Sequence, residues 1–139
     1  RVKEQVDVPV IANGDITGTT TARKALAQST ADGVMVGRGA QGKPWLLAQI
    51  AHDLWDAPAP DVPDGAALVR LVCGHYEAML SFYGLGLGLR VARKHLGWYM
   101  DVVGAPVGLR RMILTSKDPQ EVLRLLPDAL SQQPEDAAA

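Results

Sequence analysis

The chain has 139 residues, a formal net charge of −1 and 47% hydrophobic residues, which is typical of a folded globular protein. Its single cysteine excludes an internal disulfide, and no apolar run approaches the ~20 residues of a membrane-spanning helix. These features favour a protein of the reducing cytoplasm.

Two short apolar runs flank a helix-forming segment near the start of the chain. Residues 8–12 and 34–36 are apolar and each run ends at a glycine turn, so both are predicted to be buried strands. Residues 22–28 between them favour a helix, with Thr20 or Thr21 as its N-cap. Strand, helix and strand in this order predict a βαβ unit with two parallel strands.

Glycine turns follow both predicted strands. Asn13-Gly14-Asp15 follows the first strand, and Gly37-Arg38-Gly39 follows the second. Glycine lets backbone N–H groups approach an anion, and a (β/α)8 barrel has its phosphate site after its last two strands. The two turns therefore fit a phosphate site, although ordinary βα turns of any α/β sheet are an equally good interpretation of these residues alone.

The next segments predict a helix and then a domain boundary. Lys43-Pro44-Trp45 opens a helix, with Pro44 near its first position and an apolar stripe reaching Leu54. Residues 56–64 contain three prolines and are predicted to form a stiff, extended linker.

Beyond the linker the periodicity is purely helical. Gly84, Gly86 and Gly88 are predicted to mark a loop, with a place for Gly86 inside the next helix as the alternative. Asp118 is predicted to cap the last helix, with Pro119 at its first position and Glu121 at its third. Short connections predict a small antiparallel bundle, and residues 131–139 are predicted to be a flexible tail. The predicted helices cover residues 65–83, 89–103, 107–114 and 119–130.

The near-neutral net charge conceals one basic segment. Between residues 84 and 117, six cations stand against Asp101 alone, giving this segment a charge of +5. Arg90, Arg93, Lys94, Gly97 and Trp98 fall on one predicted face of the second helix, opposite an apolar face. Cations one turn apart beside an aromatic ring fit an RNA contact. A solvated basic face with Trp98 in the core is the alternative for an arbitrary sequence.

Histidine and cysteine give no sign of a catalytic or metal site. His52, His75 and His95 are well separated along the sequence and lack ligand-like spacing, so no metal site is predicted. Two interpretations of His95 are equally good: a contact with RNA, or packing in the core. Cys73 lies on a helical pattern and is predicted to be a buried structural thiol.

Two blocks of the sequence resemble one enzyme family. Residues 11–16, Ile-Ala-Asn-Gly-Asp-Ile, and residues 31–45, Ala-Asp-Gly-Val-Met-Val-Gly-Arg-Gly-Ala-Gln-Gly-Lys-Pro-Trp, resemble the tRNA-dihydrouridine synthases of the bacterial B-type, NifR3-like branch. Residues 88–99, Gly-Leu-Arg-Val-Ala-Arg-Lys-His-Leu-Gly-Trp-Tyr, resemble the helical RNA-binding domain of that family. The resemblance covers the chain except for residues 56–64 and the tail after residue 131.

The resemblance implies a fold class of α/β followed by all-α. Residues 1–55 would be the closing βα units of an FMN-binding TIM barrel, and residues 65–130 a helical tRNA-binding domain. Because a complete (β/α)8 barrel needs about 250 residues, we expect the chain to be the carboxyl-terminal portion of a longer protein.

The resemblance also implies an activity and a set of site residues. The family reduces the C5=C6 bond of uridine in tRNA with FMN and NADPH, and a cysteine of the amino-terminal part protonates C5. Cys73 does not match that cysteine, so no catalytic residue is assigned and the chain by itself is expected to be inactive. It is expected to bind FMN weakly or not at all, because part of a barrel exposes sheet edges and an apolar strand face. Asp15 is expected to hold the turn or a ribityl hydroxyl. The FMN-phosphate matches are Asn13, Gly14, Asp15, Gly37 and Arg38, and the tRNA candidates are Arg90, Arg93, Lys94 and Trp98.

Two other interpretations are open at this stage. The first is a different phosphate-binding (β/α)8 enzyme, although the basic helical segment after the barrel argues against it. The second is a non-enzymatic RNA-binding or regulatory module that retains the glycine turns without their function.

Overall fold

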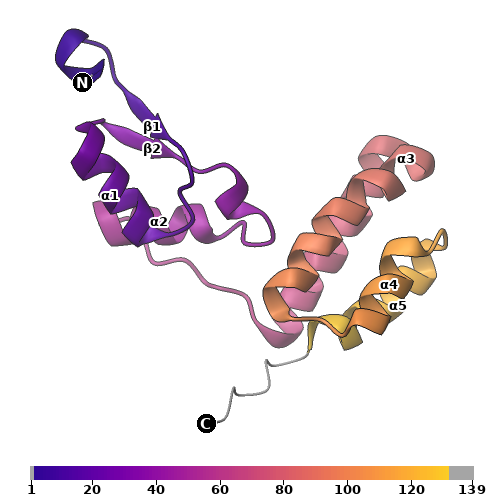
Figure 1. Cartoon of the computed structure of the whole chain (residues 1–139). Helices are drawn as coiled ribbons and strands as arrows, with labels where there is room; N and C mark the ends of the chain where they lie inside the picture. The colour runs from indigo at the N-terminus through magenta and orange to yellow at the C-terminus, as the bar shows by residue number, and fades with distance from the viewer. Residues whose placement is uncertain (1, 132–139) are drawn as a thin grey trace. The chain divides into compact units, whose positions relative to one another are not determined.

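A computed structural model describes residues 2–131, which divide into two compact units between Val62 and Pro63 (Figure 1). The predicted flexible tail lies outside the described residues from residue 132 onward. Within the described part, no helix has the length and apolar character needed to cross a membrane.

The first unit contains the predicted βαβ arrangement. The strands β1 and β2 pair in parallel, with Ile11 opposite Gly33 and Asn13 opposite Met35, which confirms the predicted pairing. The helix predicted from Lys43 begins three residues later, at Leu46, with Trp45 as its N-cap residue. The elements are η1 (Val2–Gln5), β1 (Ile11–Asn13), α1 (Thr19–Ser29), β2 (Gly33–Met35), η2 (Arg38–Ala40) and α2 (Leu46–Trp55).

The start of α1 differs from the predicted threonine cap. Gly18 is the N-cap residue, and Thr21 lies in the first helical turn. The Thr21 hydroxyl accepts hydrogen bonds from the backbone N–H groups of Thr17 and Gly18, at 2.9 and 3.1 Å. The Thr21 side chain therefore folds back across the first turn of α1 and satisfies the two backbone N–H groups that precede the helix.

Both strands are more exposed than predicted. Ile11 keeps 56% of its surface exposed and Met35 keeps 46%. The described chain supplies only two strands, and α1 and α2 cover only part of them, so the prediction of fully buried strands is wrong for these residues. The core of this unit consists of Ile16, Ala22, Leu46 and Ile50, with Ala25, Val34, Val36 and Leu54 packed against it.

The second unit is built on α3 (Gly65–Val103), which reverses direction at Gly84. Gly84 has a φ of 72° and a ψ of 166°, a conformation that favours glycine, and it is the one non-helical position inside α3. The predicted loop is therefore wrong at Gly88, which is helical, and the alternative that places Gly86 in the following helix is confirmed. The two halves of α3 lie side by side (Figure 1).

The two halves of α3 approach each other most closely at Gly88. A Cβ atom added there would lie 3.0 Å from the backbone Cα of Leu80 and 3.0 Å from the carbonyl oxygen of Met79. Such a separation is tighter than ordinary van der Waals contact, and the atoms it meets are backbone. Glycine at this position therefore permits the close packing of the two halves.

The reversal also brings together histidines that are 20 residues apart in the sequence. The rings of His75 and His95 lie edge to face with centroids 5.0 Å apart, and His75 Nδ1 lies 3.1 Å from the Tyr99 hydroxyl. The separation of His75 and His95 along the sequence therefore did not predict that their rings are neighbours in space. Burial lowers the pKa of both imidazoles, and the neighbouring His75 lowers the pKa of His95 further. No cluster of three metal-ligating side chains occurs among residues 2–131.

Helices α4 (Val107–Thr115) and α5 (Pro119–Leu130) complete the second unit. The predicted cap is confirmed, because an Asp118 carboxylate oxygen accepts a hydrogen bond of 2.9 Å from the backbone N–H of Gln120. Glu121 accepts a 2.6 Å hydrogen bond from the Ser116 hydroxyl instead of closing a capping box. Side chains that are almost completely buried form the core, namely Val72, Tyr76, Leu96, Met100, Ile113, Val122 and Leu126.

Cys73 is half-buried, not fully buried as predicted. Burial raises the pKa of its thiol, and the nearby Glu77 carboxylate raises it further. The thiol therefore stays protonated near neutral pH, which fits a structural role.

We predict opposite effects for alanine at two neighbouring glycines of α3. Gly88→Ala should lower the free energy of unfolding by about 1–3 kcal/mol, because the new methyl group meets the Leu80 backbone. Gly86→Ala is the matched control, since nothing lies within 4 Å of its added Cβ, and it should raise that energy by about 0.5–1 kcal/mol through helix propensity. Chemical denaturation followed by circular dichroism measures both, and equal effects would contradict the close approach.

A second prediction concerns the stability of the helical unit in mild acid. The folded His75 and His95 resist protonation more than the unfolded chain does, whose histidines titrate near 6.5. Stability is therefore present in full above 6.5 and declines as pH falls through that value towards the lower folded pKa.

The midpoint of thermal unfolding should fall between about pH 7.5 and about pH 5.5. His95→Gln should reduce this dependence, whereas His52→Gln, in the other unit, should leave it unchanged. An identical pH dependence in all three proteins would show that the imidazole pair does not control it.

Candidate functional site

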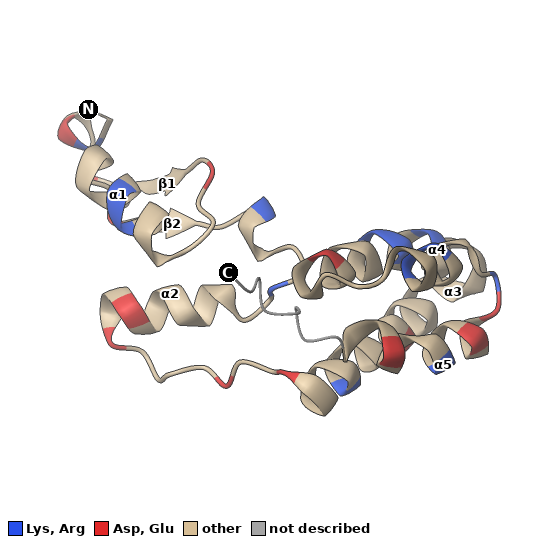
Figure 2. Cartoon of the chain, turned by 60° about the horizontal axis from the view of Figure 1, so that its bottom comes forward, with Lys and Arg blue, Asp and Glu red and all other residues tan. Residues whose placement is uncertain are grey.

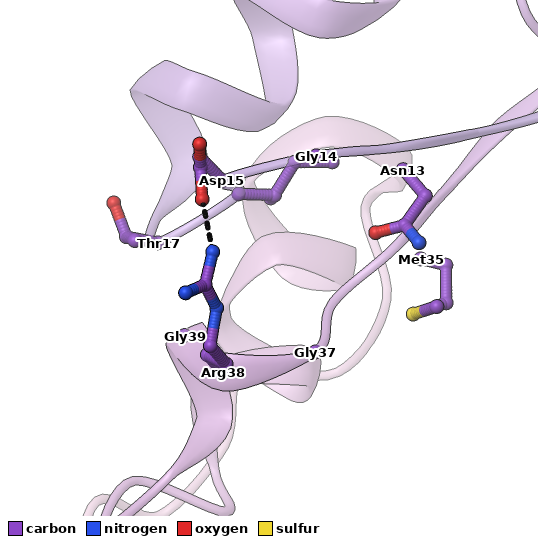
Figure 3. A pocket seen from close by; sticks show the side chains of 9 residues that line it. Asn13, Gly14, Asp15, Thr17, Met35, Gly37, Arg38 and Gly39 are labelled. Atoms are coloured by element: carbon purple, nitrogen blue, oxygen red, sulfur yellow. Dashed lines mark hydrogen bonds and ion pairs between the residues drawn. The ribbon is translucent and has the colours of Figure 1, made fainter.

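The two predicted glycine turns meet at one hollow in the first unit. Its volume is about 700 Å³, and it lies at the carboxyl ends of β1 and β2 (Figure 3). Gly14 and Gly37 both line it, as expected for turns that follow neighbouring parallel strands. Its lining residues are Asn13, Gly14, Asp15, Ile16, Thr17, Met35, Gly37, Arg38 and Gly39.

Gly39 sets the distance between the two turns. A Cβ atom at this position would overlap the carbonyl oxygen of Ile16 and would lie 2.9 Å from the Cα atom of Thr17. The backbone after β2 thus rests directly on the backbone after β1. Any side chain at position 39 would force the turns apart and open the hollow.

An ion pair spans the hollow between the two turns. Arg38 Nη2 donates a 2.8 Å hydrogen bond to Asp15 Oδ1, and the two side chains are 83% and 88% exposed (Figure 3). Such an exposed pair contributes only about 0–1 kcal/mol. The guanidinium is therefore oriented by Asp15 and is still accessible to a stronger anion. Asp15 itself has a left-handed backbone, with a φ of 46°.

The chemistry of this hollow fits a phosphate monoester. Arg38 supplies a planar, permanently charged donor, and the glycine turns leave backbone accessible. Asp15 is the one carboxylate among the lining residues, and it already pairs with Arg38. On the side towards the strands, Met35 offers an apolar surface and Asn13 offers a side-chain amide.

The second candidate site lies on the second half of α3. Arg90 and Lys94 are one helical turn apart, both are exposed, and neither forms an ion pair within the described part of the chain. They line a hollow of about 430 Å³ together with Leu87, Val91 and His95. Figure 2 shows Lys and Arg gathered where α4 lies beside α3, whereas α5 carries both acidic and basic residues.

The structure separates Arg93 from the other two predicted RNA-binding cations. Arg93 is half-buried, and its Nη2 lies 3.5 Å from the carbonyl oxygen of Ser116, between α4 and α5. Its Nε is buried without a hydrogen-bond partner among the described residues. Arg93 therefore faces the interior of the helical unit and does not lie beside Arg90 and Lys94.

Gly97 and Trp98 also depart from the predicted exposed face. Gly97 is buried under Arg110, whose Nη1 donates a 2.8 Å hydrogen bond to the Gly97 carbonyl and pairs with Asp101 at 2.8 Å. Trp98 is half-buried, and its ring lies edge to face with His95 at 5.0 Å. The face of α3 that carries Arg93 and Gly97 is covered by the following helices, so the exposed basic face reduces to Arg90 and Lys94.

Sequence reasoning missed an aromatic hollow beside these two cations. Phe82 and Tyr83, at the end of the first half of α3, line a hollow of about 340 Å³ with His75, Val91 and His95. Phe82 is 81% exposed. Two adjacent aromatic residues directly before a glycine are the signal in the sequence, but their helical spacing also fits an apolar face of the helix predicted over residues 65–83.

Comparison with known proteins places this chain in one family. The family model described as "Dihydrouridine synthase (Dus)" matches residues 1–134. A protein of Rhodobacter capsulatus described as a "Probable tRNA-dihydrouridine synthase" is 54% identical over 132 residues, which are 95% of this chain and 40% of that protein. A protein of Rickettsia conorii with the same description is 47% identical, over 87% of this chain and 37% of its own length.

A third relative carries a more specific description. The "tRNA-dihydrouridine synthase B" of Xanthomonas axonopodis pv. citri is 38% identical over 128 residues, which are 92% of this chain and 39% of that protein. The chain thus spans about 40% of the length of these curated relatives. On the match of the family model and of these relatives, the chain belongs to the dihydrouridine synthase family.

Proposed function

We propose that this chain is the carboxyl-terminal part of a flavin-dependent tRNA-dihydrouridine synthase that reduces the C5=C6 bond of uridine in tRNA. Membership of the family and the descriptions of its relatives support the reaction class. The observation that carries the cofactor assignment is the meeting of two glycine turns and Arg38 at one hollow. Residues 1–55 then belong to the closing part of a TIM barrel, and residues 65–130 to an antiparallel helical tRNA-binding domain.

The role of the first unit is to hold the phosphate end of the flavin. When bound there and reduced by NADPH, FMN would supply the hydride chemistry for the uridine C5=C6 bond. Arg38 would neutralise the phosphate, and the backbone at Gly14 and Gly37 would approach its oxygens. Asp15 orients the Arg38 guanidinium, and Asn13 would donate its amide to the ribityl chain or the phosphate.

The role of the second unit is to bind the tRNA backbone. Arg90 and Lys94 are free of ion pairs in the described structure and would neutralise neighbouring phosphates. Arg93 would act by holding α3 against the connection that contains Ser116, and Trp98 by fixing the ring of His95. Proton donation to the uridine is not assigned to a residue of this chain, because Cys73, which lies within α3, does not match the family's proton-donating cysteine.

We predict that the hollow discriminates between flavins by their phosphate. Fluorescence titration of this chain should give tighter binding of FMN than of riboflavin, however weak both are. Arg38→Ala should remove most of that difference and weaken FMN binding by about ten- to a hundredfold, because one charge-assisted contact is worth about 1.5–3 kcal/mol.

Lys43→Ala is the control for this titration, since Lys43 is an exposed cation of the same unit that does not line the hollow. Equal affinity of the unaltered chain for the two flavins would contradict the assignment of the phosphate site.

The tRNA proposal predicts a specific change in salt dependence. Arg90→Ala and Lys94→Ala should each weaken binding to tRNA and lower the slope of log affinity against log salt by about one unit. Arg124→Ala, an exposed cation on α5, should change neither. Gel-shift titration at several salt concentrations measures both quantities. Equal binding of tRNA and duplex DNA would favour a non-enzymatic polyanion-binding module instead.

A further inference from the structure

The two hollows on α3 form one continuous surface. The aromatic hollow and the basic hollow share the side chains of Val91 and His95. Phe82 and Tyr83 lie on one side of these shared residues, and Arg90 and Lys94 lie on the other. We call the combined surface, from Phe82 to Lys94, the α3 groove.

The aromatic side of the α3 groove is not part of the core. Phe82 is 81% exposed and Tyr83 is 45% exposed, and their rings contact each other edge to face at 4.8 Å. The core of the same unit contains Tyr76 and Tyr99, which are 1% and 4% exposed. Two neighbouring aromatic rings in solvent beside a hollow are a surface on which a flat, apolar ligand group can stack.

The other side of the groove carries uncompensated positive charge. Arg90 and Lys94 have no ion-pair partner, and no carboxylate lines either hollow, within residues 2–131. The imidazoles between the two sides add no charge near neutral pH, because burial lowers the pKa of His75 and His95. A ligand that fits both sides therefore carries both an aromatic group and an anionic group.

A nucleotide has these two features, whereas a second copy of this chain does not. In a twofold pairing of grooves, Arg90 and Lys94 of the two copies would face like charges. An apolar peptide would cover the rings but would leave both cations unpaired. A paired nucleotide keeps its base inside the duplex stack, so only an unpaired one can offer its base to the rings.

We propose that the α3 groove binds one unpaired nucleotide of the tRNA, with its base on the Phe82–Tyr83 rings and its phosphate at Arg90 and Lys94. This inference rests on the proposed function and extends it, because it makes the helical unit a reader of an unstacked base and not of the phosphate backbone alone. The hydrophobic rings supply affinity that does not depend on salt, and the two cations supply the part that does.

The test compares two RNA probes and two exposed apolar positions. The probes are an unmodified tRNA transcript and a blunt RNA duplex without unpaired bases. Phe82→Ala should weaken binding of the transcript by about five- to a hundredfold, the range expected for one base–aromatic stack. It should leave the affinity for the duplex and the salt slope unchanged, since it removes no charge. Val107→Ala is the matched control, because Val107 is 82% exposed on α4 and lies outside the groove.

The possible results separate this inference from the proposed function. If the transcript binds and Arg90→Ala weakens it but Phe82→Ala does not, the base-binding groove is wrong while tRNA binding stands. Equal losses of Phe82→Ala on transcript and duplex would also overturn the groove, and thermal unfolding of the variant would identify misfolding as the cause. A dimer of the unaltered chain that Phe82→Ala dissociates, with unchanged tRNA affinity, would assign the groove to a second copy. No binding of the transcript by the unaltered chain would overturn both proposals.

Discussion

In each unit, two backbone segments meet at a distance that leaves no room for a side chain. Gly39 brings the turn after β2 onto the carbonyl of Ile16, and Gly88 brings the second half of α3 onto Leu80. The contact at Gly39 holds together the two turns that line the hollow of Arg38 and Asp15. The contact at Gly88 brings the aromatic and basic hollows onto one surface. Both candidate sites thus depend on the same steric condition, although their ligands differ.

Much of the first unit could be predicted from the sequence, because local rules decide it. Parallel strands place their carboxyl ends at one edge, so the turns at Gly14 and Gly37 had to meet once the βαβ unit formed. The burial of the strands was not predictable in this way. It depends on which other segments pack against Ile11 and Met35. The apolar pattern of a strand does not show whether those segments belong to this chain.

In the helical unit, the periodicity of the sequence does not predict which side chains the neighbouring helices cover. Positions 90, 93 and 94 lie within about 100° of each other around a helix, so the sequence alone assigns them to one face. The packing of α4 and α5 divides that face and leaves Arg93 inside beside Ser116. The histidine pair escaped prediction for a different reason. A three-glycine loop would have shifted the pairing of the two halves of α3, whereas a reversal at Gly84 alone brings His75 to His95 and Tyr99.

The exposed pair between Asp15 and Arg38 also bears on the choice of anion in the first unit. With its own carboxylate beside it, the guanidinium leaves the hollow almost neutral, so a monovalent ion such as chloride gains little by displacing Asp15. A phosphate monoester carries close to two charges at neutral pH and competes far better for the same donor. The internal carboxylate is therefore a built-in counter-ion for Arg38, and its weak, exposed pairing leaves the guanidinium open to exchange.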